Sequence, residues 1–144
     1  FVPEIFLTSE DDERSYFLYT PDGLEADAPL IFVLHGYYGD NMGMMMISGM
    51  NEIADSEGFA VCYPQGLPDF DGINHWNANL TGISNVNDVL FLTELAGYLQ
   101  AEHGFSSDCT YSYGYSNGGY MSYTLACEKP DVFRGIGSVG GTMS

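Results

Sequence analysis

The chain has 144 residues, an ordinary length for one domain, and its hydrophobic fraction of 45% is that of a globular protein. It carries 20 acidic residues against 3 lysines and arginines, which gives a net charge of -17. Such a surface repels nucleic acid and anionic membranes, so neither is expected as a partner. No apolar run approaches the ~20 residues that span a bilayer. From the length of the chain, we expect a single domain over residues 1–144.

The first half of the chain alternates between strands and helices. Strands are predicted at Arg14–Thr20 and at Pro29–His35, whose continuous apolar run is typical of a central parallel strand. A helix is predicted over Gly43–Glu57 and a further strand over Phe59–Tyr63. The acidic run Glu10–Glu13 is interpreted as a solvated turn rather than a metal site.

The second half continues this alternation after a long loop rich in glycine, asparagine and aspartate, Pro64–Thr81. Helices are predicted at Asn87–His103 and Asn117–Glu128, and strands at Cys109–Tyr113 and Gly135–Val139. Strands that alternate with helices predict an α/β fold with a mostly parallel sheet and helices on both faces.

The stretch from Gly114 to Gly118 reads Gly-Tyr-Ser-Asn-Gly and matches the pattern G-x-S-x-G. It lies between a predicted strand and a predicted helix, where a sharp turn lifts the serine hydroxyl above the sheet. Glycines are needed on both sides because side chains there would collide with neighbouring backbone. The following helix would direct its free N–H groups at a developing oxyanion. We therefore interpret Ser116 as a nucleophile rather than an ordinary turn residue.

A second motif supports this interpretation. The sequence VLHGYYGD, from Val33 to Asp40, follows the most apolar strand. Ester hydrolysis needs two donors for the tetrahedral oxyanion, one after the nucleophile and one from a loop after an early strand. The expected donors are the backbone N–H groups of Asn117 and Tyr37.

The segments LHGYYGD, YPQG and the long stretch from Asn87 to Gly141 resemble the polyhydroxybutyrate depolymerase, feruloyl esterase and acetylxylan esterase group of α/β-hydrolases. The resemblance implies a carboxylic ester hydrolase, secreted or extracellular, that acts through Ser116 without a cofactor or metal. It also implies that the loop with His75 and Trp76 lies beside the substrate cleft, where a cysteine often precedes the tryptophan.

The resemblance covers only the N-terminal half of such a domain. In α/β-hydrolases the acid and the histidine of the triad follow the nucleophile, but the sequence given ends at Ser144. We expect a truncated α/β-hydrolase domain whose last strand, Gly135–Val139, leaves an edge open to pairing. A homodimer or a complementing C-terminal half is the expected partner. The alternative function is a catalytically weak half-domain that serves as a binding module.

The chain contains three histidines that could replace the missing base. His35 ends a central strand and is expected to hold the oxyanion loop by hydrogen bonds, while His103 lies at the far end of a helix. His75 is the candidate base, although substrate contact or turn structure also explains it. The candidate orienting acids, which the sequence does not rank, are Asp40, Asp69 and Asp71.

Four aromatic residues are expected near Ser116. Trp76 is either a plug over the core or an aromatic wall for an acyl group. Tyr37, Tyr38 and Tyr115 favour a flat, aromatic or polymeric ester, because the surface charge would repel an anionic substrate. 

The cysteines show no spacing typical of zinc sites. Of the three, Cys62, Cys109 and Cys127, the first and last lie in apolar or helical runs and are interpreted as buried thiols.

Overall fold

The computed structural model describes residues 1–143, so Ser144, the last residue of the predicted domain, lies outside the described residues. It contains six strands and four helices. In chain order they are β1 (Glu4–Ser9), β2 (Asp12–Tyr19), β3 (Leu30–Leu34), α1 (Asn41–Ser48), α2 (Met50–Glu57), β4 (Ala60–Pro64), α3 (Asp88–His103), β5 (Thr110–Tyr115), α4 (Asn117–Glu128) and β6 (Gly135–Val139).

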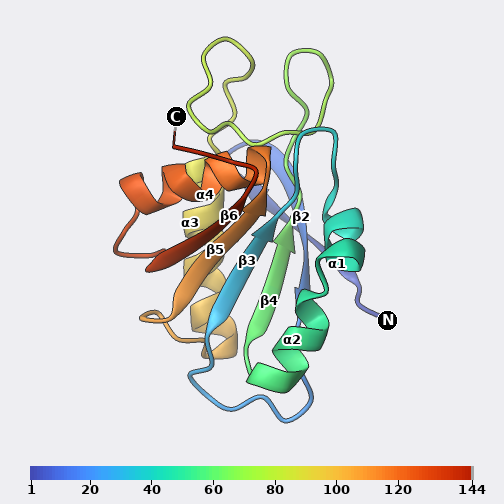
Figure 1. The fold of residues 1–144 in the computed structure, drawn as a ribbon, viewed down its shortest axis with the longest axis vertical. Helices are drawn as coiled ribbons and strands as arrows, with labels where there is room; N and C mark the ends of the chain where they lie inside the picture. Colours follow the sequence, from blue (N-terminus) through green and yellow to red (C-terminus); the bar gives the residue numbers. More distant parts are fainter. Residues whose placement is uncertain (144) are drawn as a thin grey trace.

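The strands form one sheet in the order β1-β2-β4-β3-β5-β6. Strands β4, β3, β5 and β6 run parallel, whereas β1 and β2 add an antiparallel edge. The predicted α/β class, with a mostly parallel sheet, is confirmed. The carboxyl ends of the parallel strands meet at one edge, and the segments 35–41 and 65–87 rise above it at the top of Figure 1. This edge is where open α/β sheets place their ligands.

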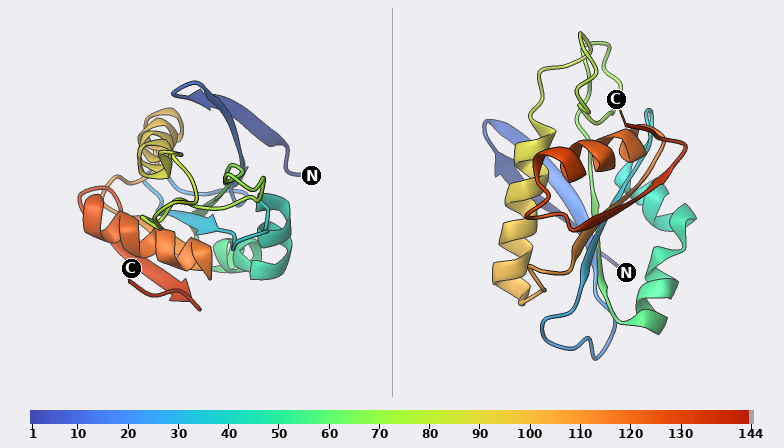
Figure 2. Two further views of the ribbon diagram at one scale, coloured as in Figure 1. Left: turned by 90° about the horizontal axis from the view of Figure 1, so that it is seen from above. Right: turned by 60° about the vertical axis from the view of Figure 1, so that its left-hand side comes forward.

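Helices cover both faces of the sheet, as the sequence predicted. Helices α3 and α4 lie on one side, and α1 and α2 lie on the other (Figure 2). Alternate residues of β3 feed two separate cores: Leu30, Phe32 and Leu34 pack under α3 and α4, while Val33 packs under α1 and α2. This double burial is why the strand reads as a continuous apolar run.

Two elements differ from the sequence prediction. The helix predicted over Gly43–Glu57 is broken into α1 and α2 at Gly49, whose φ of 67° is left-handed and ends the first helix. Strand β1 was not predicted, because it is an edge strand with mostly exposed residues and no alternating apolar pattern. It forms a hairpin with β2. Of the acidic run predicted as a solvated turn, Glu10 and Asp11 form that turn, whereas Asp12 and Glu13 begin β2.

A buried ion pair anchors the long loop above the sheet. Arg14 on β2 donates to Asp88 at the start of α3 over 2.7 Å, and both side chains are almost fully buried. The other Asp88 oxygen accepts from the Asn77 N–H at 2.7 Å, and Arg14 donates to the Gln65 carbonyl at 3.3 Å. The pair therefore ties both ends of the loop to the sheet.

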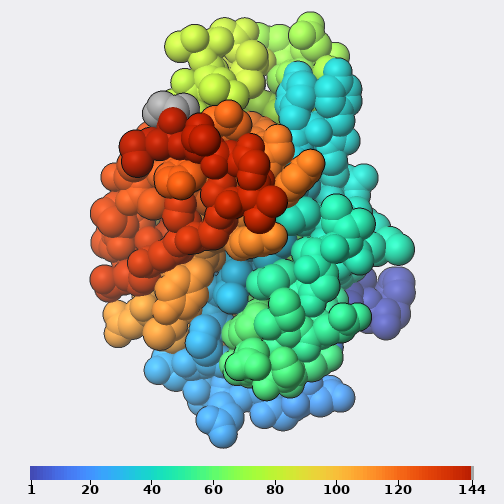
Figure 3. Space-filling view, in the orientation of Figure 1, coloured from blue at the N-terminus to red at the C-terminus, as the bar shows by residue number. Residues whose placement is uncertain are grey.

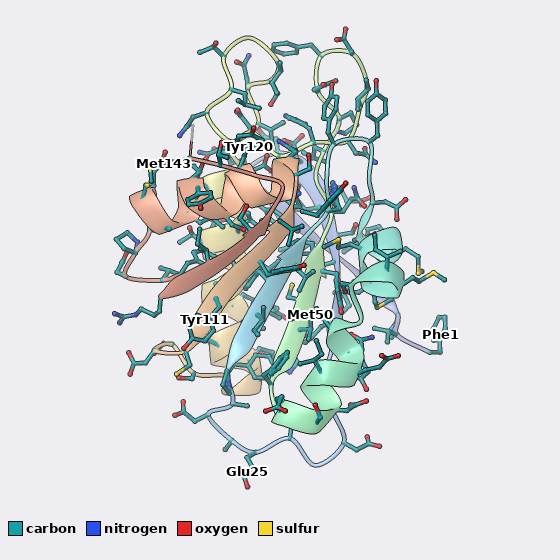
Figure 4. All side chains as sticks on the ribbon, viewed as in Figure 1. Phe1, Glu25, Met50, Tyr111, Tyr120 and Met143 are labelled. Carbon is teal, nitrogen blue, oxygen red and sulfur yellow. The ribbon has the colours of Figure 1, made fainter. Side chains whose placement is uncertain are left out.

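Part of one sheet face has no covering helix among residues 1–143. Helices α1 and α2 pack against β3 and β4, whereas α4 packs on the opposite side of β5 and β6. On the open face, the residues of β5 and β6 (orange to red) reach the surface beside α1 and α2 in Figure 3. Tyr111 lies on this face in Figure 4. Within the described residues, no helix is long and apolar enough to cross a membrane.

Candidate active site

The turn between β5 and α4 carries Ser116 in a strained conformation. Its φ of 51° and ψ of -115° lie outside the regions that L-residues prefer. The backbone is held there by two hydrogen bonds: the Ser116 N–H donates to Val139 O at 2.7 Å, and Ser116 O accepts from the Tyr120 N–H at 3.0 Å. The Ser116 side chain makes no capping bond to α4, and within residues 1–143 its hydroxyl has no hydrogen-bond partner.

The glycines of the motif are explained by close backbone approach. A Cβ at Gly114 would overlap the carbonyl of Gly118, and a Cβ at Gly118 would overlap the carbonyl oxygens of Leu34 and His35. The turn therefore sits directly against the end of β3, where the loop with Tyr37 begins. The steric reason predicted for both glycines is confirmed.

Two backbone N–H groups near this turn are available as donors. The Asn117 N–H belongs to the first turn of α4, which has no intrahelical acceptor. In the loop after β3, the Tyr38 N–H donates to Asn74 O and the Gly39 N–H donates to Gly36 O. The Tyr37 N–H has no acceptor within residues 1–143. Within residues 1–143, neither predicted donor is engaged in a hydrogen bond, which is what an oxyanion hole requires.

The side chain of Asn117 has a structural role that sequence reasoning missed. Its carbonyl oxygen accepts from the Trp76 N–H at 2.6 Å, and its amide donates to Trp76 O at 3.0 Å. The Trp76 indole N–H donates to His35 O at 3.0 Å. These bonds join the helix start, the long loop and the end of β3, and an asparagine directly after Ser116 was the only sequence signal for them.

The interpretation of Trp76 as an aromatic substrate wall needs a correction. The side chain is fully buried within the core cluster under α3 and α4. Its ring stands 5.0 Å from that of His35, centroid to centroid. Trp76 therefore fits the alternative interpretation, in which it closes the core. Through its bonds to Asn117 it also supports the turn that carries Ser116.

His35 is held as a neutral imidazole. Its Nδ1 donates to Gly36 O at 2.8 Å, and its Nε2 accepts from the Gly66 N–H at 2.9 Å. Burial of the ring is the main cause that lowers the pKa of His35 below its usual value. The ring joins the loop after β3 to the loop after β4, which is the holding role that the sequence suggested.

His75, the predicted stand-in base, is fully buried. Its Nδ1 donates to Leu67 O at 2.7 Å, and its Nε2 has no partner within residues 1–143. His75 is therefore not paired with Ser116, and its role as a base stays a prediction. His103 ends α3 and stacks on Phe105.

None of the three candidate acids bonds to a histidine within residues 1–143. Asp40 caps α1 through the Gly43 N–H at 2.6 Å. Asp69 accepts the Tyr37 hydroxyl at 2.5 Å and, through its other oxygen, the N–H groups of Asp71 and Ile73. Across the described residues, no group of three or more histidines, cysteines and acids is placed to hold a metal.

Two of the predicted substrate-binding residues are accessible. Tyr38 is 74% exposed and Tyr115 is 51% exposed. The Tyr115 ring packs against Gly36 and lines a cavity of about 220 Å³ together with Tyr37, Met44 and Ile47. This hollow has a largely apolar lining, so it suits an uncharged organic group.

The cysteines are all free thiols, and one prediction about them is wrong. Cys62 on β4 is buried, and burial raises the pKa of its thiol. Cys127 is exposed rather than buried, because it falls on the solvent side of the last turn of α4.

The mostly parallel sheet, with a strained serine between a strand and a helix at its carboxyl edge, has the arrangement of the α/β-hydrolase fold. Residues 14–143 match the model of the family described as "Esterase PHB depolymerase", and the chain belongs to that family. The protein NocK of Nocardia uniformis subsp. tsuyamanensis, whose name places it among esterases, is 33% identical over 133 residues. Feruloyl esterase B of Thermothelomyces thermophilus is 30% identical over 121 residues.

The matches cover most of this chain but less of its relatives. The NocK match spans 90% of this chain and 38% of that protein, and the feruloyl esterase match spans 82% and 40%. Among solved structures, the acetyl xylan esterase of Aspergillus awamori has the same fold, with a TM-score of 0.78 at 19% identity. That match covers 98% of this chain and 53% of the other. The chain thus spans about two fifths to one half of these proteins.

Proposed function

We propose that the chain is the nucleophile-bearing part of a serine-dependent carboxylic ester hydrolase. The observation that carries the proposal is the strained Ser116, held between β5 and α4 with a free hydroxyl and two unengaged backbone donors beside it. Membership in an esterase family supports the same reaction class.

The proposed reaction is acyl transfer through Ser116. A base accepts the hydroxyl proton as Oγ attacks the ester carbonyl carbon, and the carbonyl oxygen becomes an oxyanion. The N–H groups of Tyr37 and Asn117 stabilise that charge; loss of one such donor costs about 3–4 kcal/mol in comparable enzymes. The intermediate then expels the alcohol, which takes up the proton, and water releases the acid from the acyl-serine.

The substrate is proposed to be an uncharged ester with an aromatic or polymeric acid or alcohol. Tyr38 and Tyr115 offer exposed aromatic surface, and the cavity beside Tyr115 is largely apolar. The net charge of -17 disfavours anionic esters. The names of the relatives, feruloyl and acetyl xylan esterases, agree with this class, as does the depolymerase family name. Polymeric substrates also favour action outside the cell.

The base is proposed to come from a complementing C-terminal half or from a second copy of the chain. Ser116 has no histidine partner within residues 1–143, and His75 could serve only if its loop rearranged. The open sheet face supports a docking partner, because Tyr111 and Tyr113 are partly exposed there and lie against Gly135 and Gly137. The outer edge of β6, which pairs with no strand within residues 1–143, offers a second pairing surface.

The alternative function, a binding module with weak catalysis, predicts a different result in one experiment. A fluorophosphonate probe labels only an activated serine, so mass spectrometry should find Ser116 modified. The Ser116→Ala variant should lose both labelling and hydrolysis of 4-nitrophenyl acetate while it unfolds like the wild type. If the probe left Ser116 unlabelled even with added salt and with the complementing half present, the proposed hydrolase function would be wrong.

Assembly is tested by sedimentation. Self-repulsion at -17 opposes association, so dimers of the chain should strengthen as salt rises. A monomer that stays monodisperse at low and high salt would exclude the second copy as the source of the base.

A further inference from the structure

The loop that carries the Tyr37 N–H contains a strained turn. The Gly39 N–H donates to Gly36 O at 3.0 Å, which closes a four-residue turn. Its third residue, Tyr38, has a φ of 67°, a conformation that glycine or asparagine normally provides at this position. The turn is therefore not one that this sequence favours by itself, and outside contacts must hold it.

Those contacts come from the tip of the long loop above the sheet. The Tyr38 N–H donates to Asn74 O at 3.1 Å, and the Asn74 amide donates to Gly39 O at 3.3 Å. Both bonds hold the second half of the turn. The first half is held from this loop by one bond, in which the Tyr37 hydroxyl donates to Asp69 Oδ2 at 2.5 Å.

Asp69 is itself fixed in place. Its Oδ1 accepts from the N–H groups of Asp71 at 2.9 Å and Ile73 at 3.0 Å, and its own N–H donates to Ile73 O at 2.8 Å. The carboxylate thus presents its remaining oxygen from a rigid turn. A rigid acceptor can restrain the tyrosine that donates to it.

We propose that the Tyr37–Asp69 hydrogen bond is a latch that positions the Tyr37 N–H in the oxyanion hole. The inference rests on the proposed function, because it assigns the side chains of Tyr37 and Asp69 to the reaction that Ser116 would begin. Neither side chain touches the reacting atoms. Both act as positioning residues, and the backbone N–H of Tyr37 does the chemistry.

The electrostatics of the two groups agree with a persistent bond. The hydrogen bond to the Asp69 carboxylate is the main cause that raises the pKa of Tyr37 to about 12. The same bond is the main cause that lowers the pKa of Asp69. A phenol that donates to an ionised carboxylate forms a stronger bond than a neutral pair.

The test compares Tyr37→Phe with a matched control. Tyr19 makes the same type of exposed bond, to Asp55 Oδ1 at 2.6 Å, but it joins β2 to α2 away from Ser116. Tyr37→Phe removes the latch and keeps the backbone donor, so kcat for 4-nitrophenyl acetate should fall about five- to tenfold while KM changes less than about twofold. Tyr19→Phe should leave both unchanged. Asp69→Asn keeps an amide oxygen for the N–H groups of Asp71 and Ile73 and places an NH2 group that can donate to the Tyr37 hydroxyl oxygen, so it should lose less than Tyr37→Phe.

A second readout does not depend on turnover. Amide hydrogen exchange at Tyr38 and Gly39 should become faster in Tyr37→Phe and stay unchanged in Tyr19→Phe. Unchanged exchange overturns the latch, and so does an active Tyr37→Phe variant with wild-type kcat. If the wild-type protein hydrolyses no ester even with salt and the complementing half present, the proposed function fails, and the exchange result alone decides whether the bond holds the turn.

Discussion

Replacing Asp88 by alanine should destabilise the protein more than any surface substitution. The Asp88 carboxylate is the anionic partner of Arg14, whose side chain is 2% exposed. Without Asp88, the guanidinium keeps only the Gln65 carbonyl and the face of Phe91, 3.8 Å from its central carbon. A buried charge left without its partner costs about 3–5 kcal/mol. The Asn77 N–H also loses its acceptor, so the decrease in the free energy of unfolding should lie at the upper end of this range.

Urea unfolding at 25 °C measures this effect, with the fluorescence of Trp76, the single tryptophan, as the signal. The chain provides its own control in the exposed pair of Arg134 and Asp108, whose side chains are 47% and 86% exposed. Arg134→Ala should cost at most about 1 kcal/mol, because water and salt screen such a pair.

A double variant separates the ion pair from general damage to the core. Arg14→Met combined with Asp88→Leu removes both charges, and it should recover much of the stability that Asp88→Ala loses, because apolar replacement of a buried pair is often neutral. If Asp88→Ala cost no more than Arg134→Ala, the pair would contribute no more than a surface contact and the reasoning would be wrong.

Three further outcomes are expected. Ser116→Gly should be inactive yet about 1–3 kcal/mol more stable than Ser116→Ala in urea, because glycine relieves the strained φ of 51°; equal stabilities would count against strain. Gly118→Ala should lower the free energy of unfolding by about 1–3 kcal/mol, because its Cβ would meet the Leu34 and His35 carbonyls. The same variant should no longer be labelled by the fluorophosphonate probe at Ser116. The control is Gly97→Ala, because Gly97 lies within α3 with open space around it; this variant should raise the free energy of unfolding by about 0.5–1 kcal/mol. Burial lowers the pKa of His35 in the folded protein, so the unfolded chain takes up a proton on this imidazole at a higher pH than the folded chain does. The free energy of unfolding should therefore fall as the pH drops below about 6.5. His35→Gln should flatten that slope below about pH 6.5, and an unchanged slope would show that another group titrates there.

The strands and helices that position the site were predictable from local pattern. Gly135–Val139 and Asn117–Glu128 have the predicted bounds, and β3 and β5 differ by a residue or two at their ends. Strands β3 and β5 and helix α4 bury residues on one or both faces, so their apolar spacing records which face meets the core. Strand β1 was not predicted, because its residues are mostly exposed and show no apolar spacing that would indicate a buried face.

The sequence by itself predicted the turn that carries Ser116 and the Asn117 N–H, because strand, glycines and helix start lie within a few residues of one another. The Tyr37 N–H was predicted from a separate motif that follows β3. Tertiary structure alone decided which side chains support them. The Tyr37–Asp69 bond spans 32 positions, the Asn117–Trp76 pair 41 and the Arg14–Asp88 pair 74. The path of the loop from Pro64 to Thr81 brings these groups together. That path depends on the buried charge and backbone hydrogen bonds that anchor it, which no periodic pattern in a glycine- and asparagine-rich segment encodes.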